Sequence, residues 1–331
     1  MKPETFKDLM KLSHGFEPAR IFLSAVELDL FSQLSEKMTA QQLAARLSLQ
    51  AEPLTLVLNA LVAMGLLDKE GAVYVNRPVA EENLVSGQGY RGHIFRHISH
   101  CWPPWGNLSD RLQGREIDGE SWSPARDEEQ TRDFILGMEN VTRELAPLVV
   151  ERLELGDPVT LLDVGGGPGT YAEAFLQEYP SLREVCVFDL PKAAAVGRQN
   201  LKGKGLGTSV RWLEGDFHET SFGQGFDVVW ISQVLHSLDA SGCRMLMDKA
   251  FEALVPGGEL ILHEFLIADD RTGPLQAALF AVHMLVMTGV GRTYAGGELS
   301  AWMGEVGFVD VRVQQVSDDT SVVRGRKPVS P

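Results

Sequence analysis

Three glycines and one aspartate have the types and the spacing that suit an adenosine-containing ligand. The run LLDVGGGPGTYAEAF places Gly165, Gly167 and Gly169 directly between a predicted strand and a predicted helix. Glycine lets the backbone turn tightly and approach a ligand, and a helix N-terminus offers free N–H groups. Asp189 ends the next predicted strand in VFDLP, followed by Leu190, and its carboxylate can accept hydrogen bonds from both hydroxyls of a ribose. These residues predict a cofactor site.

A third position separates two kinds of adenosine cofactor. EGDFHE ends the third predicted strand and places Gly215 and Asp216 before Phe217, so that a carboxylate able to bind an adenine amino group adjoins a ring able to pack on the base. The spacing is G-x-G-x-G, whereas dinucleotide sites favour G-x-G-x-x-G. A nicotinamide-dependent oxidoreductase is the alternative from another class. Asp163 either orients the glycine loop or faces an ammonium group of the cofactor.

Each of these acidic residues also has a simpler structural interpretation. Asp189 precedes Pro191 and could cap the following helix, and Asp216 could merely terminate a strand. The order of all three features along the chain favours the cofactor site.

Alternating strand and helix patterns from Pro158 onward predict the elements that position this site. VTLLDV, EVCVFDL, SVRWLEGD, FDVVWIS and GELILHEFLI have strand character and are separated by helical segments. Such alternation is typical of a parallel, doubly wound α/β sheet. Two further strand patterns, FVDVRVQQV and SVVRGR, end the chain and depart from the plain Rossmann order. We expect a Rossmann-like catalytic domain.

The first hundred residues predict a separate, winged-helix-like domain. Apolar residues at helical spacing recur in three segments, Thr39 and Gln42 have the form of a capping box, and a small hairpin turns at Glu70 and Gly71. The candidate recognition helix, PLTLVLNALVAMGLL, is nearly free of Lys and Arg, and the formal net charge of −15 opposes binding to a phosphate backbone. We therefore expect no nucleic-acid partner. An apolar helix of this kind is expected to be buried, in part in a subunit interface.

The predicted domain boundaries divide the chain into three parts. Residues 1–100 form the dimerisation domain, 101–157 a helical connecting segment that lines the substrate pocket, and 158–331 the catalytic domain. The stretch from about residue 81 to residue 126 has an irregular pattern with Trp102, Trp105 and Trp122. These tryptophans either line a ligand cavity or fill the seam between domains.

Composition indicates an ordinary soluble protein. Of 331 residues, 44% are hydrophobic and 23% are charged, which fits two globular domains. The N-terminus has no signal-peptide pattern, and the most apolar run, LFAVHMLVMTGV, is too short to span a bilayer, so we expect no membrane association and a cytoplasmic location. Cys101, Cys186 and Cys243 lack metal-ligand spacing, so buried thiols and no metal are expected.

The motifs together resemble the O-methyltransferase family typified by plant caffeic acid, hydroxyindole and bacterial polyketide O-methyltransferases. The resemblance covers nearly the whole chain and rests on FILGMEN, LLDVGGGPGT, VFDLP, EGDFHE, VLHSLD, LVPGGELIL and MLVMTGVGRTYAGGELSAWMGEVGF. It implies a class I methyltransferase fold, S-adenosylmethionine as methyl donor and S-adenosylhomocysteine (SAH) as product. It also implies a small-molecule acceptor and a homodimer in which each N-terminal domain helps to close the partner's active site.

The resemblance implies a catalytic pair. His236 in WISQVLHSLD matches the general base that takes the proton from the acceptor hydroxyl, and Glu264 in ILHEFLI matches the residue that orients it. A phenol has a pKa near 10, so at pH 7 a base within hydrogen-bond reach raises its reactivity. The alternative for His236 is a cap of the following helix. His263 is predicted to point to the opposite face of its strand from Glu264 and to be structural.

The resemblance also implies residues of the substrate pocket. Phe134 and Met138 lie in FILGMEN, and Met284 and Met287 lie in the apolar run near the C-terminus. The identity of the acceptor does not follow from these residues.

Several positions depart from the family pattern. Ser232 replaces a lysine four positions before the base and is counted with the cofactor-binding residues, while Ser237 and Leu238 replace an aspartate and a tryptophan. Gly291 stands where a second acidic residue normally precedes Arg-Thr. These departures leave open carbon methylation, or chemistry on the same fold that binds the cofactor without transferring its methyl group.

Overall fold

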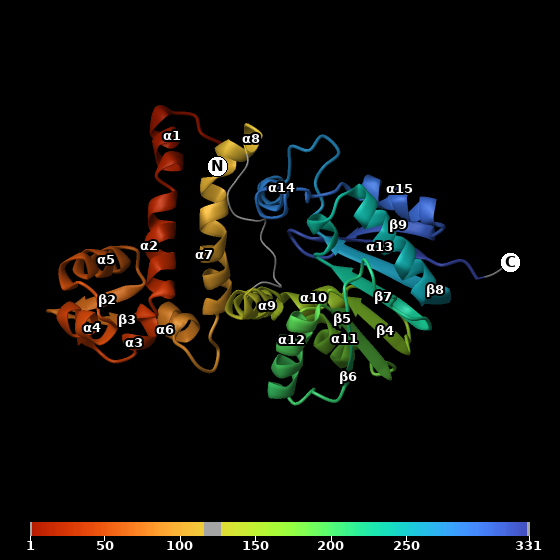
Figure 1. Cartoon of the computed structure of the whole chain (residues 1–331), viewed down its shortest axis with the longest axis horizontal. Coiled ribbons are helices and arrows are strands. Elements are labelled where there is room, and N and C mark those ends of the chain that lie inside the picture. The colour runs from red at the N-terminus through yellow and green to blue at the C-terminus, as the bar shows by residue number, and fades with distance from the viewer. Residues whose placement is uncertain (1, 116–126, 330–331) are drawn as a thin grey trace. The chain divides into compact units, whose positions relative to one another are not determined.

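A computed structural model describes residues 2–115 and 127–329, and Trp122 lies outside the described residues. The chain divides into two compact units, Met1–Trp102 and Pro103–Pro331 (Figure 1). Within the described ranges, no helix is long and apolar enough to cross a bilayer.

The first unit combines helices with a small sheet. Its elements are α1 (Phe6–Ser13), α2 (Phe16–Glu27), α3 (Leu30–Gln33), β1 (Met38–Thr39), α4 (Ala40–Leu47), α5 (Ala51–Ala63), β2 (Leu67–Glu70), β3 (Val73–Asn76), α6 (Pro78–Leu84) and α7 (Gly92–Gly106), which runs on past the unit boundary. The predicted hairpin is β2–β3, and the capping box of Thr39 and Gln42 begins α4 as expected. The two-residue strand β1 pairs with β3 and gives the order β1-β3-β2; it is too short to be recognised in the sequence.

The apolar helix α5 is only partly buried. Leu54, Leu58 and Leu61 pack in the core of the first unit, whereas Leu56 is 70% exposed. Only one face of α5 therefore meets the core, and the expected burial of the rest of this helix in a subunit interface stays a prediction.

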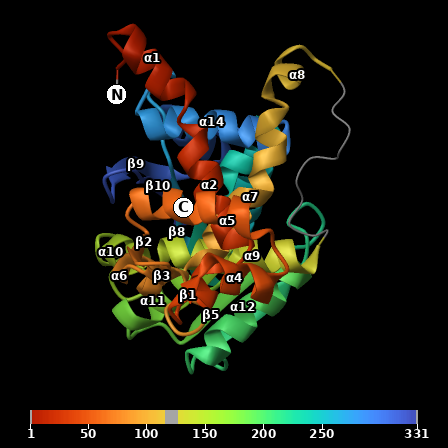
Figure 2. The same cartoon turned by 90° about the vertical axis from the view of Figure 1, so that its left-hand side faces the viewer.

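The segment with the irregular sequence pattern is largely helical. The 15-residue helix α7 continues through HISHCWPPWG, with both of its prolines near the C-terminal end. In Figures 1 and 2, α2 and α7 lie side by side; Phe22 of α2 contacts Phe95 of α7 at 4.8 Å between ring centroids, and the Arg20 guanidinium lies over Trp102. These packing contacts stabilise a helix in a stretch whose sequence pattern is irregular.

The second unit carries the large sheet and its covering helices. Its elements are α8 (Leu108–Leu112), α9 (Glu128–Thr142), α10 (Leu145–Glu151), β4 (Thr160–Val164), α11 (Thr170–Glu178), β5 (Glu184–Asp189), α12 (Pro191–Gly203), β6 (Val210–Glu214), β7 (Phe226–Ser232), η1 (Leu235–Ser237), α13 (Ala240–Ala253), β8 (Leu254–Glu264), α14 (Leu275–Thr288), α15 (Gly296–Val306), β9 (Val309–Gln315) and β10 (Ser321–Arg326).

The large sheet has seven strands in the order β6-β5-β4-β7-β8-β10-β9. The five strands from β4 to β8 are parallel as predicted, but β10 pairs antiparallel with both β8 and β9, so the sheet is mixed. The short connection between β9 and β10 accounts for the antiparallel pairing of these two strands, because such a connection can only join antiparallel neighbours. The predicted α/β architecture with a helical N-terminal domain is confirmed.

Each face of the sheet is covered by its own helices. Alternate residues of β7 enter different cores: Trp230 packs with α10, α11 and α12, whereas Ile231 packs with α13 and α15. The three cysteines are free and buried, as expected. The strand order reverses between β4 and β7, and open α/β sheets bind ligands outside the carboxyl ends of the strands at such a reversal. The candidate site is therefore sought there.

Candidate active site

The glycine loop follows β4 and has a backbone that only glycine adopts easily. Gly165, Gly167 and Gly169 have φ of 70°, 50° and 76°. A Cβ at Gly165 would lie 2.7 Å from Val234, and one at Gly169 would lie 2.7 Å from Leu201, so space is also short there. At Gly167 the nearest atom to such a Cβ would be 3.6 Å away, so this glycine leaves room above the loop.

Asp189, the last residue of β5, is hydrogen-bonded both to the glycine loop after β4 and to the residue that follows β6. Its Oδ2 accepts a hydrogen bond from the Gly167 N–H at 2.8 Å, and its Oδ1 accepts from the Leu190 N–H at 2.7 Å. The Gly215 N–H donates to the Asp189 carbonyl oxygen at 3.1 Å. Burial raises the pKa of Asp189 to about 6, against the effect of the two N–H donors. Each carboxylate oxygen has a second lone pair, so Asp189 can still accept from ribose hydroxyls.

Asp163 lies beneath the loop. It is 1% exposed, and a Cβ on Gly166 would come within 2.6 Å of its carboxyl carbon. Burial, followed by the charge of Asp189, raises the pKa of Asp163 to about 8. Its Oδ2 has no hydrogen-bond partner among the described residues. This position beneath the glycines is compatible with the first predicted role, orientation of the loop, and both predicted roles of Asp163 stay predictions.

Two residues of α12 that the sequence did not single out also hold the loop. A Cβ at Gly197 would lie 2.2 Å from the carbonyl oxygen of Gly167, so only glycine allows the helix to approach this closely. Asn200 donates a hydrogen bond to the Pro168 carbonyl at 2.9 Å. A glycine inside a predicted helix was the one signal that could have pointed to this contact.

The predicted adenine-binding pair follows β6 in a turn. Asp216 is exposed, and its Oδ1 accepts a hydrogen bond from the His218 N–H at 2.8 Å, so the simpler role of closing a turn is also present. Phe217 packs against the core beneath the sheet. Lys249 of α13 hydrogen-bonds the carbonyl oxygens of Phe217 and Thr220, which holds the turn in place.

The predicted catalytic pair comes together at the ends of β7 and β8. His236 Nδ1 lies 2.8 Å from Glu264 Oε2, and Glu264 Oε1 accepts the Leu235 N–H at 2.8 Å. The side chains of His236 and Glu264 are 12% and 4% exposed. Because a carboxylate only accepts, the neutral form of this imidazole carries its proton on Nδ1, and Nε2 is then the nitrogen with a free lone pair. The alternative role of His236 as a helix cap is wrong, since Asp239 caps α13.

The structure explains the missing second acid. A Cβ at Gly291 would lie 2.3 Å from the carbonyl oxygen of His236, and the Gly291 N–H donates to Thr288 Oγ1 at 2.7 Å. Because no side chain fits here, the segment carrying His236 packs directly against the backbone after α14.

The predicted pocket residues lie on α9 and α14. Phe134 and Met138 are half-buried on α9, whose Ile135 faces Gly167, and Met284 and Met287 are buried on α14.

The ring nearest His236 belongs to a residue that sequence analysis missed. Phe280 of α14 meets the imidazole of His236 edge-on at 4.8 Å between centroids. His283 stacks on both Phe280 and Trp105, and its Nδ1 accepts the Trp105 indole N–H at 3.0 Å. Burial, with a smaller effect of His236, lowers the pKa of His283. The one-turn spacing of Phe280 and His283 on α14 was the available signal.

Ser232 ends β7 at the reversal of strand order and is half-buried. Its hydroxyl lies 2.8 Å from Nδ1 of His263, which is buried on the opposite face of β8 from Glu264, as predicted. The polar side chains at the ends of β7 and β8 therefore form two separate hydrogen-bonded networks, one of His236 with Glu264 and one of Ser232 with His263.

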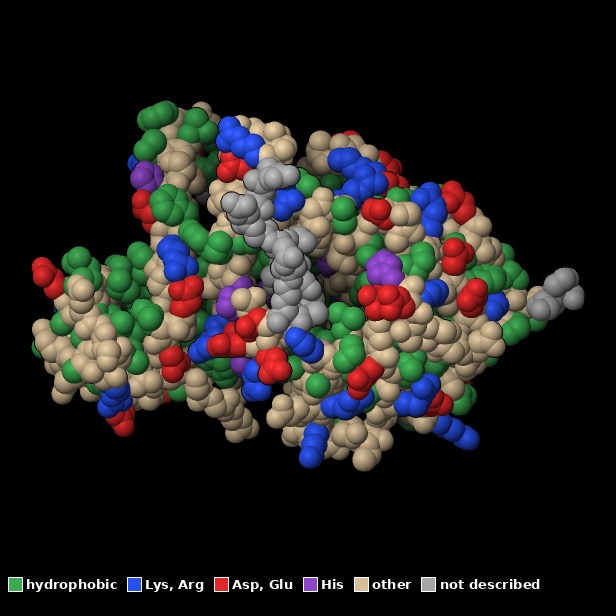
Figure 3. All heavy atoms as spheres, in the orientation of Figure 1, with side chains coloured by type: hydrophobic (Ala, Val, Ile, Leu, Met, Phe, Trp, Pro, Cys, Tyr) green, Lys and Arg blue, Asp and Glu red, His purple; other side chains and the backbone are tan. Residues whose placement is uncertain are grey.

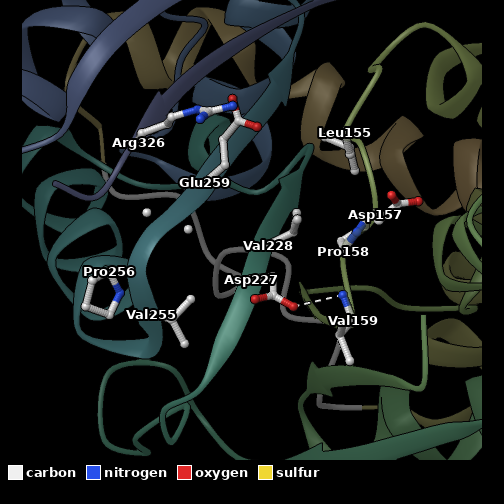
Figure 4. A pocket seen from close by; sticks show the side chains of 12 residues that line it. Leu155, Asp157, Pro158, Val159, Asp227, Val228, Val255, Pro256, Glu259 and Arg326 are labelled. Atoms are coloured by element: carbon white, nitrogen blue, oxygen red, sulfur yellow. Dashed lines mark hydrogen bonds between the residues drawn. The ribbon is translucent and has the colours of Figure 1, made fainter. Parts of the chain in front are cut away.

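A hollow of about 360 Å³ lies at the other end of the sheet. In Figure 4 it is lined by Asp157, Val159, Asp227 and Arg326, near the start of β4 and β7 and the end of β10. Asp227 accepts the Val159 N–H at 2.8 Å and so ties the strand starts together. Since ligands of open α/β sheets bind at the carboxyl ends, this hollow is not the candidate site.

Comparison with known proteins decides the family. The model of the O-methyltransferase domain matches residues 116–309, and that of the O-methyltransferase dimerisation domain matches residues 10–86. The chain belongs to the O-methyltransferase family. This O-methyltransferase depends on S-adenosylmethionine and acts on small molecules.

Two bacterial relatives and one solved structure align with this chain over nearly their whole length. It is 30% identical to the tetracenomycin polyketide synthesis 8-O-methyl transferase TcmO of Streptomyces glaucescens, over 97% of this chain and 96% of the relative. It is 29% identical to the 3-hydroxy-5-methyl-1-naphthoate 3-O-methyltransferase of Streptomyces sahachiroi, over 92% and 90%. The solved structure of PigF with SAH superposes with a TM-score of 0.89 at 26% identity, over 98% of this O-methyltransferase and 100% of that chain.

Proposed function

We propose that this O-methyltransferase methylates a phenolic hydroxyl of a small aromatic or polyketide-like molecule, with His236 as general base. The observation that carries the proposal is the pairing of His236 Nδ1 with Glu264 at 2.8 Å. Among the described residues only Nδ1 of this ring is hydrogen-bonded, so Nε2 is available to accept the proton of an acceptor hydroxyl.

Glu264 acts through His236. Its Oε1 is fixed by the Leu235 N–H, so the carboxylate cannot rotate away from the imidazole without losing that bond. The negative charge stabilises the imidazolium that forms when Nε2 takes the proton. The Phe280 ring lies against the imidazole and limits its rotation.

S-adenosylmethionine supplies an electrophilic methyl group on a cationic sulfur. We assign its binding to the residues around the loop: Asp189 accepts from the ribose, the turn of Asp216 and Phe217 meets the adenine, and Gly167 leaves space above the loop. Asp163 supports this assignment, because its buried Oδ2 has no hydrogen-bond partner among the described residues and a cation bound nearby would lower the raised pKa of this carboxyl.

The aromatic lining near the base favours a flat acceptor. Phe280, His283 and Trp105 form a stacked series next to His236. Aromatic side chains bind planar ligands by stacking and edge contacts. The names of the two Streptomyces relatives specify polyketide and naphthoate acceptors, which agrees with this geometry.

We also propose a homodimer. Phe6 and Leu12 of α1 are 77% and 73% exposed, and Phe16 and Leu28 are also exposed. In Figure 3 apolar side chains gather over α1 and over the neighbouring surface of the first unit. An apolar surface of this kind usually marks an interface, and the segment matches a dimerisation domain.

An acceptor screen tests the function. Purified protein is incubated with methyl-labelled S-adenosylmethionine and a panel of hydroxynaphthoates and polycyclic phenols, and the products are identified by mass and by carbon NMR. We expect a methoxy signal. A product methylated only on carbon, or no labelled product while SAH binds, would contradict the proposal.

A further inference from the structure

A buried histidine behind the strand ends has no part in the proton transfer described above. His263 is 1% exposed on β8, and both of its ring nitrogens lie 2.8 Å from hydroxyl oxygens, Nδ1 from Ser232 and Nε2 from Thr320. The ring stacks on Trp230 at 5.3 Å between centroids. Burial lowers the pKa of His263 to about 3, so the ring is neutral at physiological pH.

The direction of this hydrogen-bonded chain follows from its far end. Ser317 Oγ accepts the N–H groups of Asp319 and Thr320, at 3.3 and 2.9 Å, which uses both of its lone pairs. In its 2.7 Å contact with Thr320 Oγ1, the Ser317 hydroxyl is therefore the donor.

The Thr320 hydroxyl is the next group in this hydrogen-bonded chain. It is 3% exposed, and its hydroxyl contacts only Ser317 and His263 among the described residues. A buried donor is costly to leave unpaired, so the Thr320 proton goes to His263 Nε2. A neutral imidazole that accepts at Nε2 carries its proton on Nδ1, and this proton is donated to Ser232 Oγ.

Ser232 is then left with a proton that His263 cannot accept. The Tyr171 hydroxyl, 3.4 Å from His263 Nδ1, lies beside the pair. Burial raises the pKa of Tyr171 and a hydrogen bond from the Ser232 hydroxyl opposes this effect, so the Tyr171 oxygen accepts the Ser232 proton when no ligand is bound. Ser232 ends β7 at the reversal of strand order and keeps part of its surface accessible.

We propose that His263 is a positioning residue for the cofactor: through its Nδ1–H it fixes the Ser232 hydroxyl as a hydrogen-bond donor towards an acceptor atom of S-adenosylmethionine. The inference rests on the proposed cofactor crevice. This inference gives a role to Ser232, which stands where the family pattern has a lysine. The oriented Ser232 hydroxyl would supply one of the hydrogen-bond donors that the lysine ammonium group would supply.

A double-mutant cycle tests the coupling. SAH affinity is measured by calorimetry for the wild type, His263→Leu, Ser232→Ala and the double variant. Each single change should weaken binding about three- to tenfold, the size of one hydrogen bond, and the double variant should be no weaker than Ser232→Ala. The KM for S-adenosylmethionine should rise by about the same factor as the dissociation constant of SAH. Additive losses, or unchanged affinity in Ser232→Ala, would overturn the inference.

Two further measurements keep the inference testable if His263→Leu fails to fold. Thr320→Val keeps the side-chain volume at a strand end and should weaken SAH binding only when Ser232 is present. The second measurement is nitrogen NMR of the wild type without cofactor, with labelled histidine; the signals of His263 are those that His263→Asn removes. They should show a protonated Nδ1 and an unprotonated Nε2, and this pattern should not change from pH 5 to 8. A protonated Nε2 would refute the relay even if SAH binds, whereas absence of SAH binding would refute the crevice and leave this readout intact.

Discussion

The two sides of the strand-order reversal at the carboxyl edge of the sheet are built differently. On the β4–β6 side, Asp189 is held by backbone N–H groups, and burial raises its pKa. On the β7–β8 side, His236 and Glu264 pair side chain to side chain. The first side has acceptor capacity left for a ligand, whereas on the second side Glu264 is already paired with His236 Nδ1, and Nε2 remains to accept a substrate proton. We propose that the β4–β6 side supplies most of the cofactor contacts and that His236 and Glu264 carry the catalysis, with Ser232 as the proposed cofactor contact on the β7–β8 side; the variants below test this division.

The largest expected effect lies on the β7–β8 side. His236→Ala should lower kcat about 10²- to 10⁴-fold because the base is lost, and it should leave SAH affinity unchanged. Glu264→Gln keeps an acceptor for the Leu235 N–H and should give a smaller loss. Steady-state turnover and calorimetry on the same samples measure both quantities. Full activity of His236→Ala would show that another group takes the proton.

A change at Gly291 tests the same side without touching the base. Gly291→Ala introduces a Cβ that would lie 2.3 Å from the His236 carbonyl oxygen, so the short helix η1, which carries His236, must shift. Misplacement of a catalytic group by about 1 Å can cost roughly 10²-fold in rate. We expect a loss of kcat of that order with little change in SAH affinity. Gly304→Ala, at a helix position with open space, is the control and should be neutral.

The β4–β6 side should respond to pH. Ribose binding needs the ionised Asp189, whose pKa is about 6 in the protein without cofactor. The ionised fraction rises about tenfold from pH 5 to pH 7, so SAH affinity should rise by up to about tenfold over this range. Calorimetry at several pH values measures the slope, and Asp189→Asn should remove it. The same slope in Asp189→Asn would assign the titration to another group.

The smallest effect is expected at the exposed turn. Asp216→Ala removes both the adenine acceptor and the bond to the His218 N–H, and it should weaken SAH binding about two- to tenfold. Asp216→Asn keeps an acceptor for that N–H and separates the two contributions. If Asn binds as well as Asp, the turn matters and the charge does not.

The sequence predicted the β4–β6 side more completely than the β7–β8 side. Glycines between a strand and a helix, and acids at strand ends, have fixed spacing, so the amino-acid pattern alone is enough to place Gly167 and Asp189 together. His236 depended on a family resemblance, and Phe280 was missed, because contacts between a loop and a distant helix leave no local pattern. Gly197 was missed for the same reason, since its partner is the backbone of Gly167.

The strands β1 and β10 show another limit of prediction from the sequence. The two residues of β1 are too few for periodicity, and the antiparallel placement of β10 depends on the partner strand and not on its own residues. The helix α7 was concealed by glycines and prolines that tertiary packing tolerates.

The most direct test of the cofactor site is calorimetric titration of SAH into the wild type, Asp189→Ala and Asp227→Ala. Both aspartates accept backbone N–H groups at strand ends, but Asp227 does so at the opposite end of the sheet, beside the hollow of Figure 4. Asp189→Ala should weaken binding by about 1–3 kcal/mol, and Asp227→Ala should leave it unchanged. Equal affinity in Asp189→Ala and the wild type would contradict the assignment of this crevice.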